Sequence, residues 1–123
     1  MEFLGVYVRE AHADDGWWPQ AKGKTTCHVK LPKTWEEKFE VAKLSCQILH
    51  VSMPLLVDFM DDRVGHAYSA MPDRLYVIDK RGRVAFKSGR GPFGFRPLEM
   101  EQALAMLLLE EGDRPNNALR TGR

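Results

Sequence analysis

FLGVYVREAHADDGW, residues 3–17, is the stretch that decides the fold. Its first six residues are apolar apart from one glycine, which indicates a buried strand over 3–8, and an Asp-Asp-Gly turn signal follows at 14–16. Side chains alternate along a strand, so Glu10 and His12 point to one face if the extended geometry continues. A carboxylate and an imidazole would then emerge together at the carboxyl end of the strand, where the active sites of open α/β sheets lie.

Helix and strand signals alternate along the rest of the chain. Thr34 and Glu37 have the spacing of a capping box, which predicts a helix that begins near residue 35. Apolar side chains then recur every three or four positions and form one stripe, expected to face the core: Trp35, Phe39, Ala42, Cys46 and Leu49.

In the first part of the chain the sequence predicts a strand over 3–8, a loop over 17–32, a helix over 35–49 and a strand over 55–59. A short helix follows, with Asp61 or Asp62 as its predicted cap. The second part is predicted to contain strands over 75–78 and 84–87, a glycine-rich loop over 88–95, and a helix that begins at Pro97 and ends at Gly112. The last two strands flank the turn at 79–82, where Gly82 suits a left-handed conformation, so they are expected to form an antiparallel hairpin. This order matches an α/β, thioredoxin-like fold with a mixed sheet and flanking helices that lacks its first strand and first helix. We expect one domain over 1–111 and a flexible tail over 112–123.

Composition excludes several classes of partner. The chain has 18 basic and 17 acidic residues, scattered along its 123 positions, so no basic patch for nucleic acid or a membrane surface is expected. No apolar run approaches the roughly 18 residues that cross a bilayer. The two cysteines, Cys27 and Cys46, indicate reduced thiols and a cytoplasmic setting, and no grouping of side chains predicts a metal site.

Two readings of Glu10 and His12 remain open at this point. A carboxylate can orient an imidazole and move protons near neutral pH, which would make the pair an acid–base site. The alternative is an exposed pair at a strand end with no task, and spacing alone favours this alternative because such pairs are common.

Residues 7–17, YVREAHADDGW, resemble a signature of the iodothyronine deiodinase family, in which a strand with a tyrosine leads to Glu-Ala-His and then Asp-Gly-Trp. Blocks at 54–58, 72–78 and 89–95 resemble the same family in the same order. The similarity covers roughly residues 3–111, and four ordered blocks make it specific.

The resemblance implies a selenol or thiol oxidoreductase. In this family a selenocysteine, or in some members a cysteine, follows the first strand and attacks iodine on the ring of an iodothyronine. By similarity, Glu10 and His12 occupy proton-relay and substrate-contact positions, and Arg90 is the loop arginine that faces the substrate. Trp17 and Phe93, with Phe95, would line the walls around the aromatic ligand. The expected partners are a small iodinated aromatic substrate and a thiol reductant as co-substrate, without a bound cofactor.

The chain also departs from the family pattern. Neither Cys27 nor Cys46 stands at the position of the nucleophile, so the 123-residue chain by itself is expected to be inactive. Cys46 lies on the predicted apolar stripe and is expected to pack in the core, whereas Cys27 is either a resolving thiol or idle. Some members carry a histidine just before the central helix, where this sequence has Pro32 and Lys33 with only His28 nearby.

Three hypotheses follow. The first is a deiodinase-type enzyme acting on iodothyronines or related iodinated tyrosine derivatives, completed by an upstream segment with a cysteine or an in-frame UGA codon. The second is a non-catalytic thioredoxin-fold remnant that self-associates, for example as a homodimer, because a sheet without its central strand has open edges. The third is a peroxiredoxin-like thiol peroxidase with the same fold and a different substrate.

Overall fold

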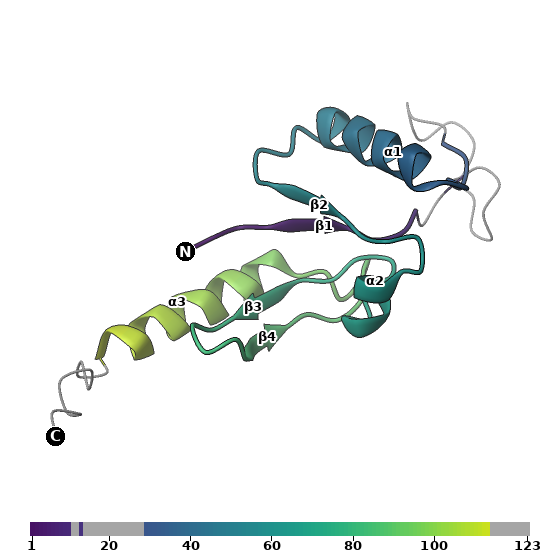
Figure 1. Cartoon of the computed structure of the whole chain (residues 1–123). Helices are drawn as coiled ribbons and strands as arrows, with labels where there is room; N and C mark the ends of the chain where they lie inside the picture. The colour runs from purple at the N-terminus through teal and green to yellow at the C-terminus, as the bar shows by residue number, and fades with distance from the viewer. Residues whose placement is uncertain (11–12, 14–28, 114–123) are drawn as a thin grey trace, which may run out of the picture. The chain divides into compact units, whose positions relative to one another are not determined.

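The computed structural model describes residues 1–10, 13 and 29–113, in which strands and helices alternate. In chain order the elements are β1 (Gly5–Tyr7), α1 (Trp35–Ile48), β2 (Leu55–Val57), α2 (Arg63–Ala67), β3 (Tyr76–Ile78), β4 (Val84–Lys87) and α3 (Pro97–Asp113) (Figure 1). The chain divides into two compact units, Met1–Pro72 and Asp73–Arg123. Each unit combines a two-stranded sheet with helices or a helix, which confirms the mixed α/β class.

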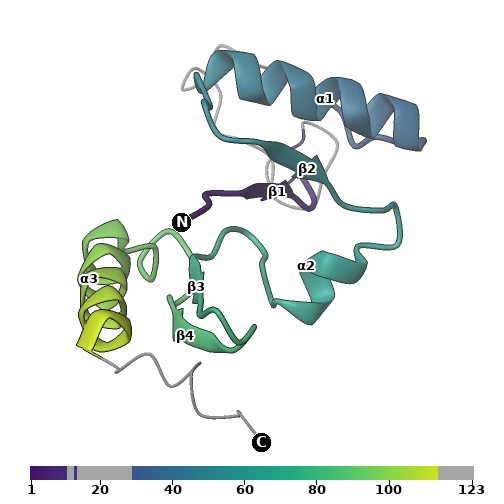
Figure 2. The same cartoon turned by 60° about the vertical axis from the view of Figure 1, so that its left-hand side comes forward.

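The sheet of the first unit pairs β1 with β2 in parallel, in the register Gly5 with Leu55 and Tyr7 with Val57. Parallel neighbours need a long crossover connection, and α1 lies in that connection. In both views α1 runs along one side of the strand pair (Figures 1 and 2). An added Cβ at Gly5 would lie 2.8 Å from the end of the Leu55 side chain, so a larger residue here would require that side chain to shift.

The capping box at the start of α1 is confirmed. Glu37 N donates to Thr34 Oγ1 at 3.2 Å, and the Glu37 carboxylate in turn accepts a hydrogen bond from Lys33 N at 2.7 Å. The first contact satisfies a donor that the first turn of a helix leaves unpaired, and the second fixes the backbone just before the N-cap. The helix therefore begins at Trp35, as the sequence predicts.

The buried face of α1 differs from the predicted apolar stripe. Ala42 is 1% exposed and Cys46 is half-buried, as expected, but Trp35 and Phe39 are exposed by about two fifths and stack on each other. Lys38, four positions before Ala42, is buried instead. Its ammonium group donates to Phe59 O at 3.1 Å, so the aliphatic stem lies inside while the charge has a backbone partner.

The side chain that caps the start of α2 is that of Asp58, so the prediction that the Asp61 or Asp62 side chain caps this helix is wrong, although Asp62 stands at the N-cap position. The buried Asp58 carboxylate accepts hydrogen bonds from Val64 N and Gly65 N, each at 3.0 Å. Asp62 stands at the N-cap position in a left-handed conformation (φ 55°) and makes no capping bond. The sequence pattern located the helix but could not show that a residue at the end of β2 would reach it.

The second unit contains the predicted hairpin. β3 and β4 are antiparallel, with Val77 opposite Phe86, and Gly82 has the expected positive φ of 79°. The Asp79 carboxylate accepts hydrogen bonds from the backbone N–H groups of Arg81 and Arg83, both at 2.9 Å, which closes the turn. The hairpin prediction is confirmed.

α3 contacts both strands of the hairpin and starts at Pro97, as predicted. The predicted end at Gly112 is wrong, because α3 includes Gly112 and continues to Asp113. A Cβ at Gly112 would meet no atom within 4 Å, so this glycine has no steric task in the helix. The division into a domain over 1–111 and a tail over 112–123 stays a prediction.

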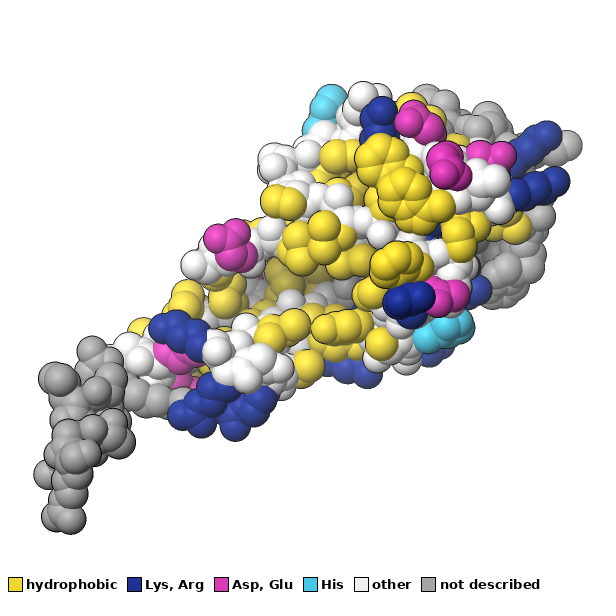
Figure 3. Space-filling view, viewed as in Figure 1, with side chains coloured by type: hydrophobic (Ala, Val, Ile, Leu, Met, Phe, Trp, Pro, Cys, Tyr) yellow, Lys and Arg dark blue, Asp and Glu magenta, His cyan; other side chains and the backbone are white. Residues whose placement is uncertain are grey.

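Much apolar surface is exposed in the described part of the chain. Figure 3 shows apolar side chains spread over the visible face. No large side chain of the described residues is fully buried, and Leu56 on β2 and Ile78 on β3 are each about half exposed. Within the described residues no helix combines the length and the apolar content needed to cross a bilayer.

Candidate functional site

Glu10 lies half-buried beyond the carboxyl end of β1, where the Tyr7 hydroxyl donates a hydrogen bond to Glu10 Oε2 at 2.8 Å. β1 ends at Tyr7, and His12 lies outside the described residues, so the expectation that Glu10 and His12 point to one face stays a prediction. The side chains of Tyr7 and Glu10, three positions apart, meet just beyond the end of the strand. Sequence reasoning did not identify Tyr7 as a site residue, although a tyrosine three residues before a glutamate at a strand end was the available signal.

The backbone of Tyr7 is fixed by the end of β2. Asp58 N donates to Tyr7 O at 2.9 Å, one step beyond the β1–β2 ladder. The side chain of the same aspartate binds the start of α2, so Asp58 joins the two strand ends to that helix. The backbone of Tyr7, whose side chain contacts Glu10, is therefore fixed by a hydrogen bond from the residue that follows β2.

Arg9, the residue before Glu10, forms an ion pair with Asp62. Arg9 Nε lies 3.7 Å from Asp62 Oδ2, and His66 Nε2 lies 3.8 Å from the same oxygen. The other oxygen of this aspartate, Oδ1, is buried and has no hydrogen-bond partner. Since Arg9 precedes Glu10, the contact links the segment that carries Glu10 to the start of α2.

Burial perturbs the ammonium group of Lys38 on α1. Burial disfavours the ammonium form and lowers the pKa of Lys38 below its ordinary value of 10.5. The negative charges of Asp58 and Asp62 oppose this shift. Lys38 therefore serves as a buried tether from α1 to the segment between β2 and α2.

Arg90 lies in the second unit, in the glycine-rich loop between β4 and α3. Its side chain is exposed, and Phe93 in the same loop is 91% exposed. Gly94 N donates to Arg90 O at 2.8 Å, which closes the loop under the arginine. Glu10 and Arg90 belong to different units, so the hypothesis that they face one substrate stays a prediction, as does the wall role of Phe93.

Several predicted residues lie outside the described residues. They are His12, Trp17, Cys27 and His28. Their roles stay predictions, including the pairing of Glu10 with His12.

Cys46 lies on α1 and its thiol donates to Val51 O at 3.6 Å. A half-buried thiol bonded to a backbone carbonyl fits the expected packing role. Over the described ranges, no three or more His, Cys, Asp or Glu side chains group together in a way that could hold a metal ion.

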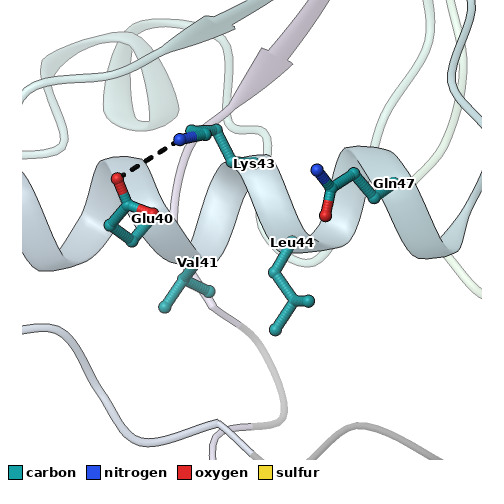
Figure 4. Close-up of a pocket in the computed structure, with 5 residues that line it drawn as sticks. All are labelled: Glu40, Val41, Lys43, Leu44 and Gln47. Atoms are coloured by element: carbon teal, nitrogen blue, oxygen red, sulfur yellow. Dashed lines mark hydrogen bonds and ion pairs between the residues drawn. The ribbon is translucent and has the colours of Figure 1, made fainter.

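A shallow hollow beside α1 contains none of the candidate site residues. Figure 4 shows its lining side chains, which all come from this one helix: Glu40, Val41, Lys43, Leu44 and Gln47. Glu40 and Lys43 form an ion pair at 3.5 Å between two exposed side chains. The candidate residues therefore remain Glu10 at the end of β1 in the first unit and, separately, Arg90 in the glycine-rich loop of the second unit.

Comparison with known proteins agrees with the resemblance in the sequence. The family model described as iodothyronine deiodinase matches residues 1–107. Similar proteins include a type I iodothyronine deiodinase of Xenopus laevis, 31% identical over 99 residues that make up 80% of this chain and 37% of the relative. A thyroxine 5-deiodinase of Sparus aurata is 33% identical over 103 residues, 84% of this chain and 37% of the relative.

A third relative, a type II iodothyronine deiodinase of Fundulus heteroclitus, is 29% identical over 109 residues, 85% of this chain and 40% of the relative. The chain thus spans about two fifths of the length of the curated relatives it matches. All four sequence blocks quoted above, from 7–17 to 89–95, lie inside the matched range of 1–107. The chain belongs to the iodothyronine deiodinase family.

Proposed function

We propose that this chain provides the proton-handling and substrate-recognition residues of an enzyme that reductively removes iodine from iodothyronines or related iodinated tyrosine derivatives. The observation that carries the proposal is the hydrogen bond from the Tyr7 hydroxyl to Glu10 at 2.8 Å, at the end of β1. It gives a strand-end carboxylate a fixed orientation, which an acid–base group needs and an idle surface carboxylate does not. The relatives named above act on iodothyronines or thyroxine, and their similarity supports the substrate class.

The reaction is a two-electron reduction of the carbon–iodine bond. A selenolate or thiolate attacks iodine, a bond from selenium or sulfur to iodine forms, and the electron pair of the broken bond stays on the ring carbon. That carbon takes a proton to give the carbon–hydrogen bond. Two molecules of thiol reductant then release iodide and restore the nucleophile, leaving as a disulfide.

Glu10 acts in the proton step of this scheme. A carboxyl group has two oxygens and can exchange protons with more than one partner. In the proposed arrangement Glu10 exchanges a proton with His12, while the Tyr7 hydroxyl, which donates to Glu10 Oε2, holds the carboxyl group in place. Arg90, with its permanent charge and forked donors, binds an anionic group of the substrate from the glycine-rich loop.

The nucleophile is proposed to come from a segment upstream of the printed residues. Cys46 is half-buried and bonded to Val51 O, which does not fit an activated thiolate. We therefore propose that the 123 residues alone do not turn over substrate. The thiol co-substrate suits a reducing compartment such as the cytoplasm.

Sequencing upstream and assaying the extended chain tests the proposal. We expect an in-frame segment that predicts a strand followed by a cysteine or a UGA codon. The extended chain with dithiothreitol should then release iodide from thyroxine and show no turnover of hydrogen peroxide, and its variant with serine in place of the nucleophile should release none. A reading frame with neither nucleophile, or peroxide turnover without iodide release, would contradict the proposal, and the second result would select a thiol peroxidase.

Self-association is a second candidate, favoured by the exposed apolar side chains. Each sheet of the described chain contains two strands, and Leu56 on β2 and Ile78 on β3 are about half exposed. Open strand edges beside apolar faces favour pairing with another chain. Self-association is proposed for the 123-residue chain in isolation. It is compatible with the proposal that a longer chain forms the enzyme.

A further inference from the structure

We propose that Asp62 is a positioning residue for Glu10 and acts through Arg9. It holds the segment that follows β1 in the conformation in which the Tyr7 hydroxyl meets the Glu10 carboxyl group. This inference rests on the proposed function, because positioning affects the reaction only if Glu10 handles a proton. All four residues belong to the first unit, so the inference depends only on contacts within that unit.

The Asp62 carboxylate has a defined place at the start of α2. The residue is 8% exposed, and its backbone is left-handed with φ 55°. A Cβ on Gly65 would overlap the Asp62 carboxylate, so the glycine leaves the space that this group occupies. In the described part of the chain Asp62 Oδ1 is buried without a hydrogen-bond partner. Such an oxygen costs free energy, so stability alone does not explain an aspartate at this position.

The other oxygen of Asp62 connects separate elements. Oδ2 lies 3.7 Å from Arg9 Nε, beyond the end of β1, and 3.8 Å from His66 Nε2 on α2. Lys38 on α1 lies within electrostatic reach of both partners, because the negative charge of Asp62 stabilises its ammonium group and the positive charge of Arg9 opposes it. The carboxylate therefore attracts the segment after β1 toward the start of α2.

This ion pair continues the attachment of the chain where the strand ladder stops. Asp58 N donates to Tyr7 O at 2.9 Å, one step beyond the paired residues of β1 and β2. Among the described residues, the next hydrogen bond or ion pair from this segment to the β2–α2 connection is that of Arg9 with Asp62. Glu10 follows Arg9 directly, so the position of its carboxyl group depends on this second attachment.

Loss of the attachment should lower kcat and leave KM nearly unchanged. Without it the Glu10 carboxyl group is aligned for a smaller fraction of the time, and this affects the proton step rather than substrate binding. Because the ion pair is partly exposed, we expect Asp62→Asn and Arg9→Gln each to lower kcat for iodide release by the extended chain by about 1.5- to 5-fold. The double variant should lose no more than either single variant, since all three remove the same contact.

Three further variants separate positioning from a general loss of structure. Asp61→Asn is the matched control, because this neighbouring carboxylate is exposed and pairs with Arg63 at 2.8 Å, and it should keep full kcat. Arg9→Lys retains the positive charge and should keep most of kcat. Gly65→Ala leaves every charge in place but displaces the Asp62 carboxylate, so it should lower kcat as Asp62→Asn does.

A second readout needs no turnover. With 3-fluorotyrosine incorporated into the 123-residue chain, the ¹⁹F resonance of position 7 is assigned by its loss in Tyr7→Phe. Glu10→Gln removes the charge of the acceptor and should move this resonance. Arg9→Gln and Asp62→Asn should move it in the same direction by a smaller amount, and Asp61→Asn should leave it in place.

The outcomes separate this inference from the proposed function. If the resonance moves in Glu10→Gln but in neither Arg9→Gln nor Asp62→Asn, or if these two variants keep full kcat, the positioning role is wrong and the proposed function stands. Losses in kcat that add up in the double variant would also contradict it.

The remaining results are equally decisive. If the unaltered extended chain releases no iodide, the proposed function is wrong, and the ¹⁹F comparison still shows whether Asp62 holds Glu10. If Glu10→Gln leaves the resonance in place, the contact between Tyr7 and Glu10 is absent and both proposals lose their support. Should Asp62→Asn fail to fold, Arg9→Gln decides, because it changes a side chain that is 49% exposed.

Discussion

Asp58 and Lys38 show how single buried polar residues organise the first unit. Asp58 uses its backbone N–H for Tyr7 on β1 and its carboxylate for Val64 and Gly65 on α2. Lys38 brings α1 to the same segment through Phe59 O. Buried polar groups are costly unless bonded, and here each bond connects a different element.

Lys38→Met should change how stability depends on pH. Burial lowers the pKa of Lys38 below 10.5 in the folded chain, so between the lowered value and 10.5 the unfolded chain holds a proton that the folded chain lacks. Stability from this group therefore rises with pH through that window. The free energy of unfolding of both chains can be measured with urea at about pH 7 and about pH 10. Between these values it should increase more, or decrease less, for the unaltered chain than for the Met variant. A gap that stays constant or moves the other way would show that Lys38 is not desolvated.

Asp58→Ala tests the cap of the short helix α2. The change removes the acceptor of three backbone N–H groups, those of Phe59, Val64 and Gly65. The two on α2 are left partly buried without this partner, at a cost of about 1–3 kcal/mol each at most and less if the helix start frays. Asp61→Ala is the matched control, because Asp61 is exposed and its ion pair is with the neighbouring, exposed Arg63 at 2.8 Å. Chemical denaturation should give a clearly lower free energy of unfolding for Asp58→Ala than for Asp61→Ala. Equal stabilities would mean that Asp58 does not hold the helix.

At the scale of elements, local chemistry was predictable and tertiary contacts were not. The capping box at Thr34 and the left-handed Gly82 depend on neighbours within four residues, so the sequence specified both. The buried side of α1 depends on what packs against it, which is why Lys38 is buried although it lies outside the predicted apolar stripe. The cap from Asp58 spans six residues and a turn, beyond the reach of capping rules.

Among the candidate site residues, too, some features could be predicted from local sequence and others depend on tertiary contacts. Glu10 and Arg90 were identified from motif positions, because a strand end and a glycine-rich loop are visible in the sequence. The hydrogen bond from Tyr7 to Glu10 was not predicted, since it depends on how the chain bends after β1. Alternation rules describe strands and stop being valid where the strand stops.

For the whole molecule, the two small sheets and the exposed apolar side chains set an expectation for the isolated chain. We expect the 123 residues alone to self-associate at concentrations of tens of micromolar, because their apolar faces lack cover. Sedimentation velocity over a range of concentrations measures this. A chain extended upstream through the proposed first strand and helix should remain monomeric or form one defined oligomer. A monomeric 123-residue chain that melts cooperatively would rule out the self-associating remnant.

Iodide release by the extended chain, with Glu10→Gln compared with Glu101→Gln, tests the central claim most directly. Glu10 and Glu101 undergo the same chemical change, but only the first accepts the hydrogen bond of Tyr7. If Glu10 handles the proton in reductive deiodination, its variant should lose about 100-fold or more in kcat, as expected for an acid–base group, while Glu101→Gln keeps full activity. Equal iodide release by the two variants would contradict the account.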